Sequence, residues 1–460
     1  MVFLRDNPFS SSDTNSPSKS SYNRRRTWKI LFRISVATVV LTTCYFIGRG
    51  VHWEKISESY NPRDIDFSQY ICNLPQTTLS KLLSSSSLAA IQQQQLSNAN
   101  LLEHQRIEYL KTKETLVPDV TIPKDVWNGL PVKGAYYMVV RNEKIMDARM
   151  VARSMEDHMK NGTQYPWVLL NNQPFAVEFK RHIKKVITAP VFFGKIDLEA
   201  WDYPHWIDVD RAEFLMLEQE TKGAYKGSSL SYHQLMRYHS GFFFHHPLLR
   251  DVEYTWRVEP GADYSCQMDD DMFLYMKEHN KSLGFVITML EARQTIPTLW
   301  QRVNEFTERF PQHVLPEYET IYPWIYDEDA DDYNNCHFWT NFQLADLSFF
   351  RSEAYRKYFE YLDRTGNFFY ERWGDAPVQT IAAALFLKKE QIHFFNNIGY
   401  THSVATHCPY NNTLLKKCHC DVNKNFDFHR SSCTKKLLKL LDPKAISSMN
   451  KFIKEKEIKL

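Results

Sequence analysis

From about residue 124 onward, apolar runs of strand length alternate with amphipathic stretches of helical periodicity. The strand-like runs are residues 135–140, 167–171, 190–194, 254–258 and 283–290, and the helical stretches include residues 144–159, 175–186, 231–244 and 374–387. Strands that alternate with helices favour a mostly parallel sheet with helices on both faces. We therefore predict an α/β fold.

The run at residues 254–258 ends abruptly in Glu259, Pro260 and Gly261. Open α/β sheets place ligand-binding groups just beyond the carboxyl ends of their strands. Glu259 is therefore a candidate site residue. The alternative is a turn acid that precedes a strand-breaking Pro-Gly pair.

Two further acidic groups stand at the start of helical stretches. Asp269, Asp270 and Asp271 precede an apolar helical run, and Asp375 opens the stretch at residues 374–387. Acids in the first turn cap a helix and offset its dipole. The triple aspartate also has the Asp-x-Asp spacing of a metal motif, but we predict the capping role for it. Capping by itself would also account for Asp375.

Charge and motifs exclude several classes of protein. The chain has 56 Lys and Arg against 54 Asp and Glu, a formal net charge of +2, which does not indicate a nucleic-acid partner. It has no Gly-x-Gly-x-x-Gly, P-loop, Gly-x-Ser-x-Gly or His-Glu-x-x-His motif. These absences weigh against dinucleotide-binding, NTPase, serine-hydrolase and zinc-protease functions.

The N-terminal part has the pattern of a membrane anchor. Residues 28–48 are apolar apart from Lys29 and Arg33, which can reach the headgroups, and three arginines precede them. We predict a single-pass type II protein with a cytosolic tail, an anchor, a stem and a lumenal domain. Their bounds are residues 1–27, 28–50, 51–123 and 124–460.

Seven cysteines lie outside the predicted anchor: Cys72, Cys266, Cys336, Cys408, Cys418, Cys420 and Cys433. The group between Cys408 and Cys433, with two nearby histidines, could instead be a zinc cluster. The Cys-x-Cys spacing is tighter than in usual zinc sites, and a lumenal compartment is oxidising. We predict disulfides, with at least one cysteine free or intermolecular because seven is odd.

Five stretches together resemble the fungal α-1,2-mannosyltransferases of glycosyltransferase family 15. They are residues 237–248 (RYHSGFFFHHPL), 254–260 (YTWRVEP), 333–342 (YNNCHFWTNF), 368–378 (FFYERWGDAPV) and 393–402 (HFFNNIGYTH). The resemblance covers roughly residues 133–433. It implies a GT-A-like nucleotide-sugar transferase domain, GDP-mannose as donor, Mn2+ as cofactor, retention of anomeric configuration and a type II Golgi membrane location.

The resemblance also implies roles for single residues. Glu259 matches the family's metal-ligand acid, and His402 matches its second protein ligand. A divalent cation can neutralise the charge that builds on a departing diphosphate, and mixed carboxylate and imidazole ligation suits Mn2+.

Four other positions follow from the same motifs. Tyr232 matches a tyrosine that contacts the donor phosphates, the alternative being an aromatic side chain that packs inward. Arg141 lies in the first strand-to-loop turn, near the expected nucleotide. Arg372 and Asp375 lie in the stretch at the acceptor side and are candidate catalytic residues.

The chain departs from the family pattern at two positions. Gly261 replaces an aspartate of the Glu-Pro-Asp motif. Gln343 replaces a glutamate that is the family's candidate nucleophile, and an amide cannot attack as a carboxylate does. If Gln343 occupies that catalytic place, the reaction proceeds by front-face return, recruits another acid such as Asp375, or is altered.

Three functions are compatible with these observations. The first is transfer of mannose from GDP-mannose to a mannose hydroxyl on O-linked or N-linked glycans of glycoproteins. The second is mannosylphosphate transfer with release of GMP, for which no nucleophilic glutamate is needed. The third is a non-catalytic glycan-binding protein of the Golgi.

Overall fold

The structure, a computed structural model, describes residues 120–159 and 165–458. The chain separates into two units, residues 1–116 and 117–460, and the described residues belong to the second. The predicted tail and anchor, most of the predicted stem, and Cys72 lie outside the described residues. Within residues 120–159 and 165–458, no helix is long and apolar enough to cross a membrane.

A seven-stranded sheet forms the centre of the second unit, with strand order β12-β6-β11-β4-β1-β2-β3. Its strands are β1 (Gly134–Val139), β2 (Trp167–Asn171), β3 (Val191–Lys195), β4 (Tyr254–Val258), β6 (Leu283–Phe285), β11 (Phe342–Asp346) and β12 (Ile392–Phe394). β1 pairs in parallel with β2 and β4, while β11 is antiparallel to both β4 and β6. The prediction of a mostly parallel sheet is confirmed.

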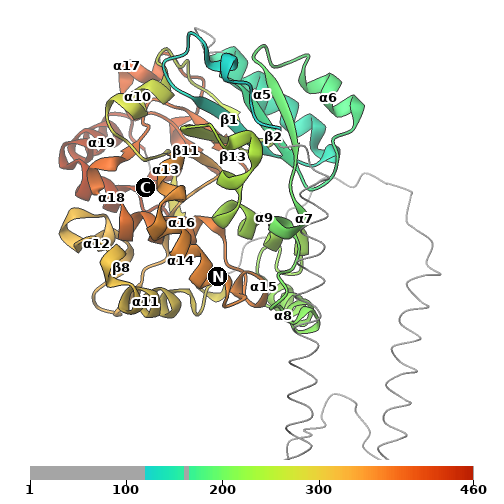
Figure 1. Cartoon of the computed structure of the whole chain (residues 1–460). Coiled ribbons are helices and arrows are strands. Elements are labelled where there is room, and N and C mark those ends of the chain that lie inside the picture. The colour runs from blue at the N-terminus through green and yellow to red at the C-terminus, as the bar shows by residue number, and fades with distance from the viewer. Residues whose placement is uncertain (1–119, 160–164, 459–460) are drawn as a thin grey trace, which may run out of the picture. The chain divides into compact units, whose positions relative to one another are not determined.

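Helices cover both faces of this sheet, as predicted (Figure 1). One face packs against α9 (Leu230–Gly241), α14 (Glu353–Asp363) and α16 (Asp375–Phe386). The other packs against α5 (Ile145–His158), α6 (Val177–Ile183) and α10 (Met272–Glu278). Neighbouring residues on β1 serve opposite cores, since Tyr137 belongs to the first cluster and Tyr136 to the second.

The remaining elements are short or peripheral. The helices are α7 (Leu198–Trp201), α8 (Val209–Thr221), α11 (Leu299–Arg309), α12 (Tyr322–Ile325), α13 (Leu347–Arg351), α15 (Asn367–Tyr370), α17 (Asn412–Leu415), α18 (Thr434–Leu441) and α19 (Pro443–Glu455). The strands form small sheets: β5 (Asp263–Tyr264) with β13 (Tyr400–His402) and β14 (Ala405–His407), β7 (Thr288–Leu290) with β10 (Cys336–Phe338), and β8 (Tyr326–Asp327) with β9 (Asp332–Tyr333).

The prediction of one strand over residues 283–290 is wrong. The segment forms two strands in different sheets, because β6 pairs with β11 and β12 whereas β7 pairs with β10. An apolar run by itself does not reveal that its two halves have different partners.

The capping role predicted for the triple aspartate is confirmed at Asp271. Its carboxylate accepts hydrogen bonds from the backbone N–H groups of Phe273 and Leu274, each at 3.0 Å, at the start of α10. Asp269 forms an ion pair with Lys417 instead. Asp271 is therefore a helix cap, and Asp269 takes part in a tertiary ion pair.

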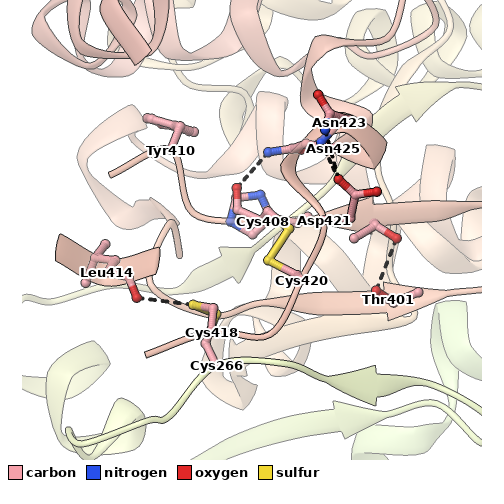
Figure 2. Close-up of a disulfide and its surroundings, with 12 residues drawn as sticks. Cys266, Thr401, Cys408, Tyr410, Leu414, Cys418, Cys420, Asp421, Asn423 and Asn425 are labelled. Atoms are coloured by element: carbon pink, nitrogen blue, oxygen red, sulfur yellow. Dashed lines mark hydrogen bonds between the residues drawn. A yellow bond between two sulfur atoms is a disulfide. The ribbon is translucent and has the colours of Figure 1, made fainter. Parts of the chain in front are cut away.

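Six of the seven cysteines form three disulfides. This confirms the prediction of disulfides rather than a zinc cluster. Cys266–Cys418 and Cys408–Cys420 lie near one another beside β13 (Figure 2), and Cys336–Cys433 joins β10 to the start of α18. Asn425 also donates to the backbone oxygen of Cys408 at 2.6 Å. Cys266–Cys418 and Cys336–Cys433 therefore link the C-terminal segment to earlier parts of the chain, whereas Cys408–Cys420 closes a loop within it.

We expect the double substitution Cys336→Ser and Cys433→Ser to lower the free energy of unfolding by about 2 to 4 kcal/mol, because the bond closes a loop of 97 residues. Urea unfolding without reductant measures the change. Adding reductant should shrink the difference between wild type and variant. Equal stability of the two proteins under oxidising conditions would contradict the pairing.

Candidate active site

The strand order places a switch point at the carboxyl ends of β1 and β4. The chain proceeds from β1 to β2 and β3 on one side, whereas β4 lies on the other side of β1. Ligands bind at such points in open α/β sheets. Arg141 follows β1 and Glu259 follows β4, so both predicted residues lie at this edge.

A row of buried polar side chains crosses the sheet just before this edge. Tyr137, Arg257 and Gln343 are register partners on β1, β4 and β11. Side chains that are opposite one another on paired strands point to the same face. The row therefore faces α9 and α16, which supply its other polar partners.

Arg257 links two carboxylates. Its Nη1 donates to Asp375 Oδ2 at 2.5 Å, and its Nη2 donates to Glu259 Oε2 at 3.2 Å. Burial opposes the charge of Arg257, yet Asp375 and Glu259 together raise its pKa above the ordinary value. The guanidinium therefore stays charged and holds both acids.

Asp375 is enclosed rather than presented to a substrate. Asp375 is only 2% exposed. Its Oδ2 accepts hydrogen bonds from both Arg257 and Thr340 Oγ1, the latter at 2.9 Å. The carboxylate thus bonds to the sheet side of the site, and Gly374 rather than Asp375 occupies the N-cap of α16. This arrangement suits a residue that positions Arg257 and Glu259.

Gln343 is also buried, at 5% exposure, and belongs to an uncharged network. Its Nε2 donates to Gln379 Oε1 at 2.6 Å, and Gln379 Nε2 donates to the backbone oxygen of His239 at 2.8 Å. The His239 ring contacts the Tyr137 hydroxyl at 3.0 Å. Burial, together with the charge of Arg257, lowers the pKa of His239 well below its usual value, so this imidazole is neutral near pH 7.

A second polar group surrounds Arg372, which precedes α16 and is 5% exposed. Its Nη2 donates to Glu291 Oε1 at 3.0 Å, and its Nη1 donates to the Tyr232 hydroxyl at 3.4 Å. Burial raises the pKa of Tyr232, although Arg372 opposes the shift, so the phenol keeps its proton. Tyr232 was predicted to contact the donor phosphates and Arg372 to lie at the acceptor side. The structure places the two side chains in contact.

His402 comes to the same region through the small sheet. β13 pairs with β5, and Tyr400 and Thr401 are opposite Tyr264 and Asp263. The turn between β4 and β5 begins at Glu259, whose backbone oxygen accepts from the N–H of Ala262 at 3.1 Å. Pairing of β13 with the strand just after this turn brings His402 toward Glu259.

The free atoms of these two side chains fit a metal ion. His402 Nδ1 is buried without a hydrogen-bond partner, and Glu259 has a hydrogen bond on Oε2 but none on Oε1 within the described part of the chain. Imidazole nitrogen and carboxylate oxygen are a ligand set that Mn2+ accepts. Residues 120–159 and 165–458 contain no group of three or more His, Cys, Asp or Glu that could hold an ion, so other ligands would come from substrate or water.

Two predicted positions have a different local setting. Arg141 is exposed and forms an ion pair with Glu143 at 3.0 Å, and no hydrogen bond or ion pair joins it to the other predicted site residues within the described ranges. Gly261 has a φ of 83°, the left-handed region that favours glycine. The turn after Glu259 is therefore built on the residue that departs from the family pattern.

Sequence reasoning missed Arg257, Glu291, Thr340 and Gln379. Arg257 had a usable signal, since a charged residue inside an apolar strand and two positions before Glu259 lies on the same face. Glu291 had none, because its contact with Arg372 joins segments 81 residues apart.

We expect Asp375→Asn to lower the free energy of unfolding by about 3 kcal/mol, because the buried Arg257 charge loses a partner. Urea unfolding measures this change. Asp346→Asn is the matched control, since Asp346 caps α13 through the Ser348 N–H and asparagine caps equally well. Equal effects of the two substitutions would contradict the role of Asp375.

Comparisons with known proteins agree with this fold. The family model described as glycolipid 2-alpha-mannosyltransferase matches residues 89–441. Glycolipid 2-alpha-mannosyltransferase 2 of Candida albicans is 45% identical over 315 residues, which are 68% of this chain and 68% of the relative. The O-glycoside alpha-1,2-mannosyltransferase omh1 of Schizosaccharomyces pombe is 42% identical over 66% of this chain and 78% of its own.

Solved structures are similar as well. Core-mannan synthase A (CmsA/Ktr4) from Aspergillus fumigatus, in its Mn/GDP form, has a TM-score of 0.64 and 33% identity, covering 67% of this chain and 85% of that one. The mannosyltransferase Ktr4p from S. cerevisiae in complex with GDP has a TM-score of 0.64 and 34% identity, covering 71% and 85%. The resemblance seen in the motifs is confirmed, and the chain belongs to the glycolipid 2-alpha-mannosyltransferase family.

Proposed function

We propose that this protein is a manganese-dependent glycosyltransferase that moves mannose from GDP-mannose to a mannose hydroxyl of a glycan, in α-1,2 linkage and with retention. The observation that carries the proposal is that Glu259, directly after β4, and His402, on the strand paired with β5, each keep a ligand atom without a hydrogen bond in the described part of the chain. The Mn/GDP form of a structural relative and the mannosyltransferase names of the sequence relatives support it.

Each site residue then has a defined task. Glu259 and His402 would hold Mn2+, and the ion would supply positive charge to offset the negative charge of the diphosphate leaving group. Tyr232 and Arg372 donate hydrogen bonds to the phosphate oxygens, and Glu291 orients Arg372. Arg257 and Asp375 keep the Glu259 carboxylate in place.

Arg141 and Gln343 have roles at the margins of this site. Arg141 has an exposed guanidinium beyond the end of β1, where it can contact the nucleotide. The buried amide of Gln343 supports the wall of the site through Gln379 rather than attacking the sugar. On this proposal the acceptor hydroxyl attacks on the same face from which GDP departs.

The cellular setting is also part of the proposal. Residues 28–50 would anchor the protein in the Golgi membrane, with residues 51–123 as stem and the catalytic domain in the lumen. The three disulfides support an oxidising compartment. The acceptors would be mannosylated glycoproteins.

The burial of Gln343 also favours a second candidate, mannosylphosphate transfer, in which the acceptor attacks phosphorus and no carboxylate nucleophile is needed. Incubation of the full chain in neutral detergent with GDP-mannose, Mn2+ and α-mannobiose separates the two. We expect GDP and a longer neutral mannoside. GMP and an acidic mannoside would replace our proposal with the second candidate. Donor binding without either product would favour the non-catalytic glycan-binding protein.

Glu259→Gln and His402→Ala should each weaken Mn2+ binding and reduce turnover by at least about a hundredfold, because each removes one of two protein ligands. Electron paramagnetic resonance of free Mn2+ measures binding separately from activity. Glu178→Gln, an exposed carboxylate on α6, is the control and should change neither quantity. Undiminished Mn2+ binding in both site variants would remove the pair from the metal site.

A further inference from the structure

A cavity of about 490 Å3 is lined by residues in or next to α8, α11, α14 and α15. Figure 1 shows where these helices lie, on a part of the fold that the proposed reaction does not use. Four arginines line it: Arg211, Arg302, Arg309 and Arg364. One carboxylate, Glu305, is among its lining residues. The lining therefore has an excess of positive charge.

Two of these arginines have carboxylate partners. Arg302 Nη1 donates to both Glu305 oxygens at 2.8 Å, and Arg364 Nη2 donates to Glu360 Oε1 at 2.8 Å. Even so, the Nε of Arg302 is buried and has no hydrogen-bond acceptor. The carboxylates of Glu305 and Glu360 therefore offset the charges of Arg302 and Arg364, but the Nε–H of Arg302 remains without an acceptor.

The other two arginines have no such partner. Within residues 120–159 and 165–458, neither Arg211 nor Arg309 forms an ion pair. Their guanidinium groups lie instead over aromatic rings, Arg211 at 4.7 Å from the centre of Tyr370 and Arg309 at 5.5 Å from that of Phe310. About two positive charges at the cavity are therefore uncompensated.

The size and the walls of the cavity suit more than a small anion. A water molecule occupies about 30 Å3 in the liquid, so the volume leaves room for a sugar ring beside a phosphate. Tyr361, Tyr370 and Asn367 also line the cavity, with Arg211 over one face of the Tyr370 ring and Asn367 Nδ2 bonded to Thr298. Such aromatic and amide groups contact sugars well.

Two hydrogen bonds and the backbone between Glu371 and Arg372 connect the cavity to the candidate active site. Asn367 Nδ2 donates to Thr298 Oγ1 at 3.0 Å, and Thr298 Oγ1 donates to Glu371 Oε1 at 2.6 Å. Glu371 is the neighbour of Arg372, whose N–H donates to the Thr295 backbone oxygen at 3.0 Å. One short segment, residues 367–372, thus serves both places.

We propose that this arginine cavity is a second binding site, and that it takes a phosphomonoester carried on a sugar. A phosphomonoester carries about 1.5 to 2 negative charges at pH 7, which matches the two uncompensated guanidinium groups. Arginine forks bind phosphate oxygens with two parallel hydrogen bonds. The further statement that the bound sugar belongs to an acidic glycan acceptor rests on the proposed transferase function, whereas binding of the phosphomonoester does not.

The test measures binding of mannose 6-phosphate to the full chain in neutral detergent by calorimetry, with saturating GDP and Mn2+ to fill the donor site. We expect saturable binding, no binding of mannose, and at least about a tenfold loss of affinity in the Arg211→Gln, Arg309→Gln double variant. Arg153→Gln with Arg181→Gln, on α5 and α6, is the matched control and should bind normally. Turnover of a neutral acceptor should be unchanged in both double variants.

Several outcomes would overturn the proposal. They are equal affinity of wild type and the cavity variant, displacement of mannose 6-phosphate by GDP, or no binding at all. Vesicles of phosphatidic acid in neutral lipid form a further arm: binding to them that the cavity variant loses, without binding of mannose 6-phosphate, would assign the cavity to a lipid phosphate. Inactivity toward GDP-mannose with intact mannose 6-phosphate binding would refute the transferase proposal alone.

Discussion

The site depends on one buried charge, the guanidinium of Arg257. A lone cation inside a sheet would be costly, and the contacts with Asp375 and Glu259 compensate it. Asp375 belongs to α16 and Glu259 follows β4. The Arg257 side chain therefore links the start of α16 to the end of β4 and fixes the position of the Glu259 carboxylate. The same interaction explains why Asp375 faces inward.

His402, the second metal-ligand candidate, is positioned by the small three-stranded sheet rather than by the central sheet. β13 carries His402 and pairs with β5, and the Cys266–Cys418 disulfide joins the segment after β5 to the C-terminal part. Arg372, Tyr232 and Glu291 come from three separate segments and meet through hydrogen bonds. Tyr232 and Arg372, which the family motifs assign to the donor and acceptor sides, thus belong to one hydrogen-bonded group.

Much of the fold could be predicted from the sequence because its signals are local. Strand-like runs between helical stretches predicted the parallel sheet, and Asp271 was correctly interpreted as a cap. The position of Glu259 at a strand end could also be predicted. Residues 283–290 could not be divided into two strands, since pairing partners far along the chain decide that division. Glu291, Thr340 and Gln379 could not be found for the same reason.

The sequence by itself determined the alternation of strands and helices in the sheet region, which carboxylate ends the central strand, and which family the motifs resemble, because periodicity and motif order are local properties of the chain. Tertiary structure alone decided that Gln343 bonds to Gln379, that Asp375 is closed in by Arg257 and Thr340, and that four arginines share a cavity. Those outcomes depend on register between strands and on packing between helices. Both bring together side chains that are distant in the chain, and no local pattern encodes them.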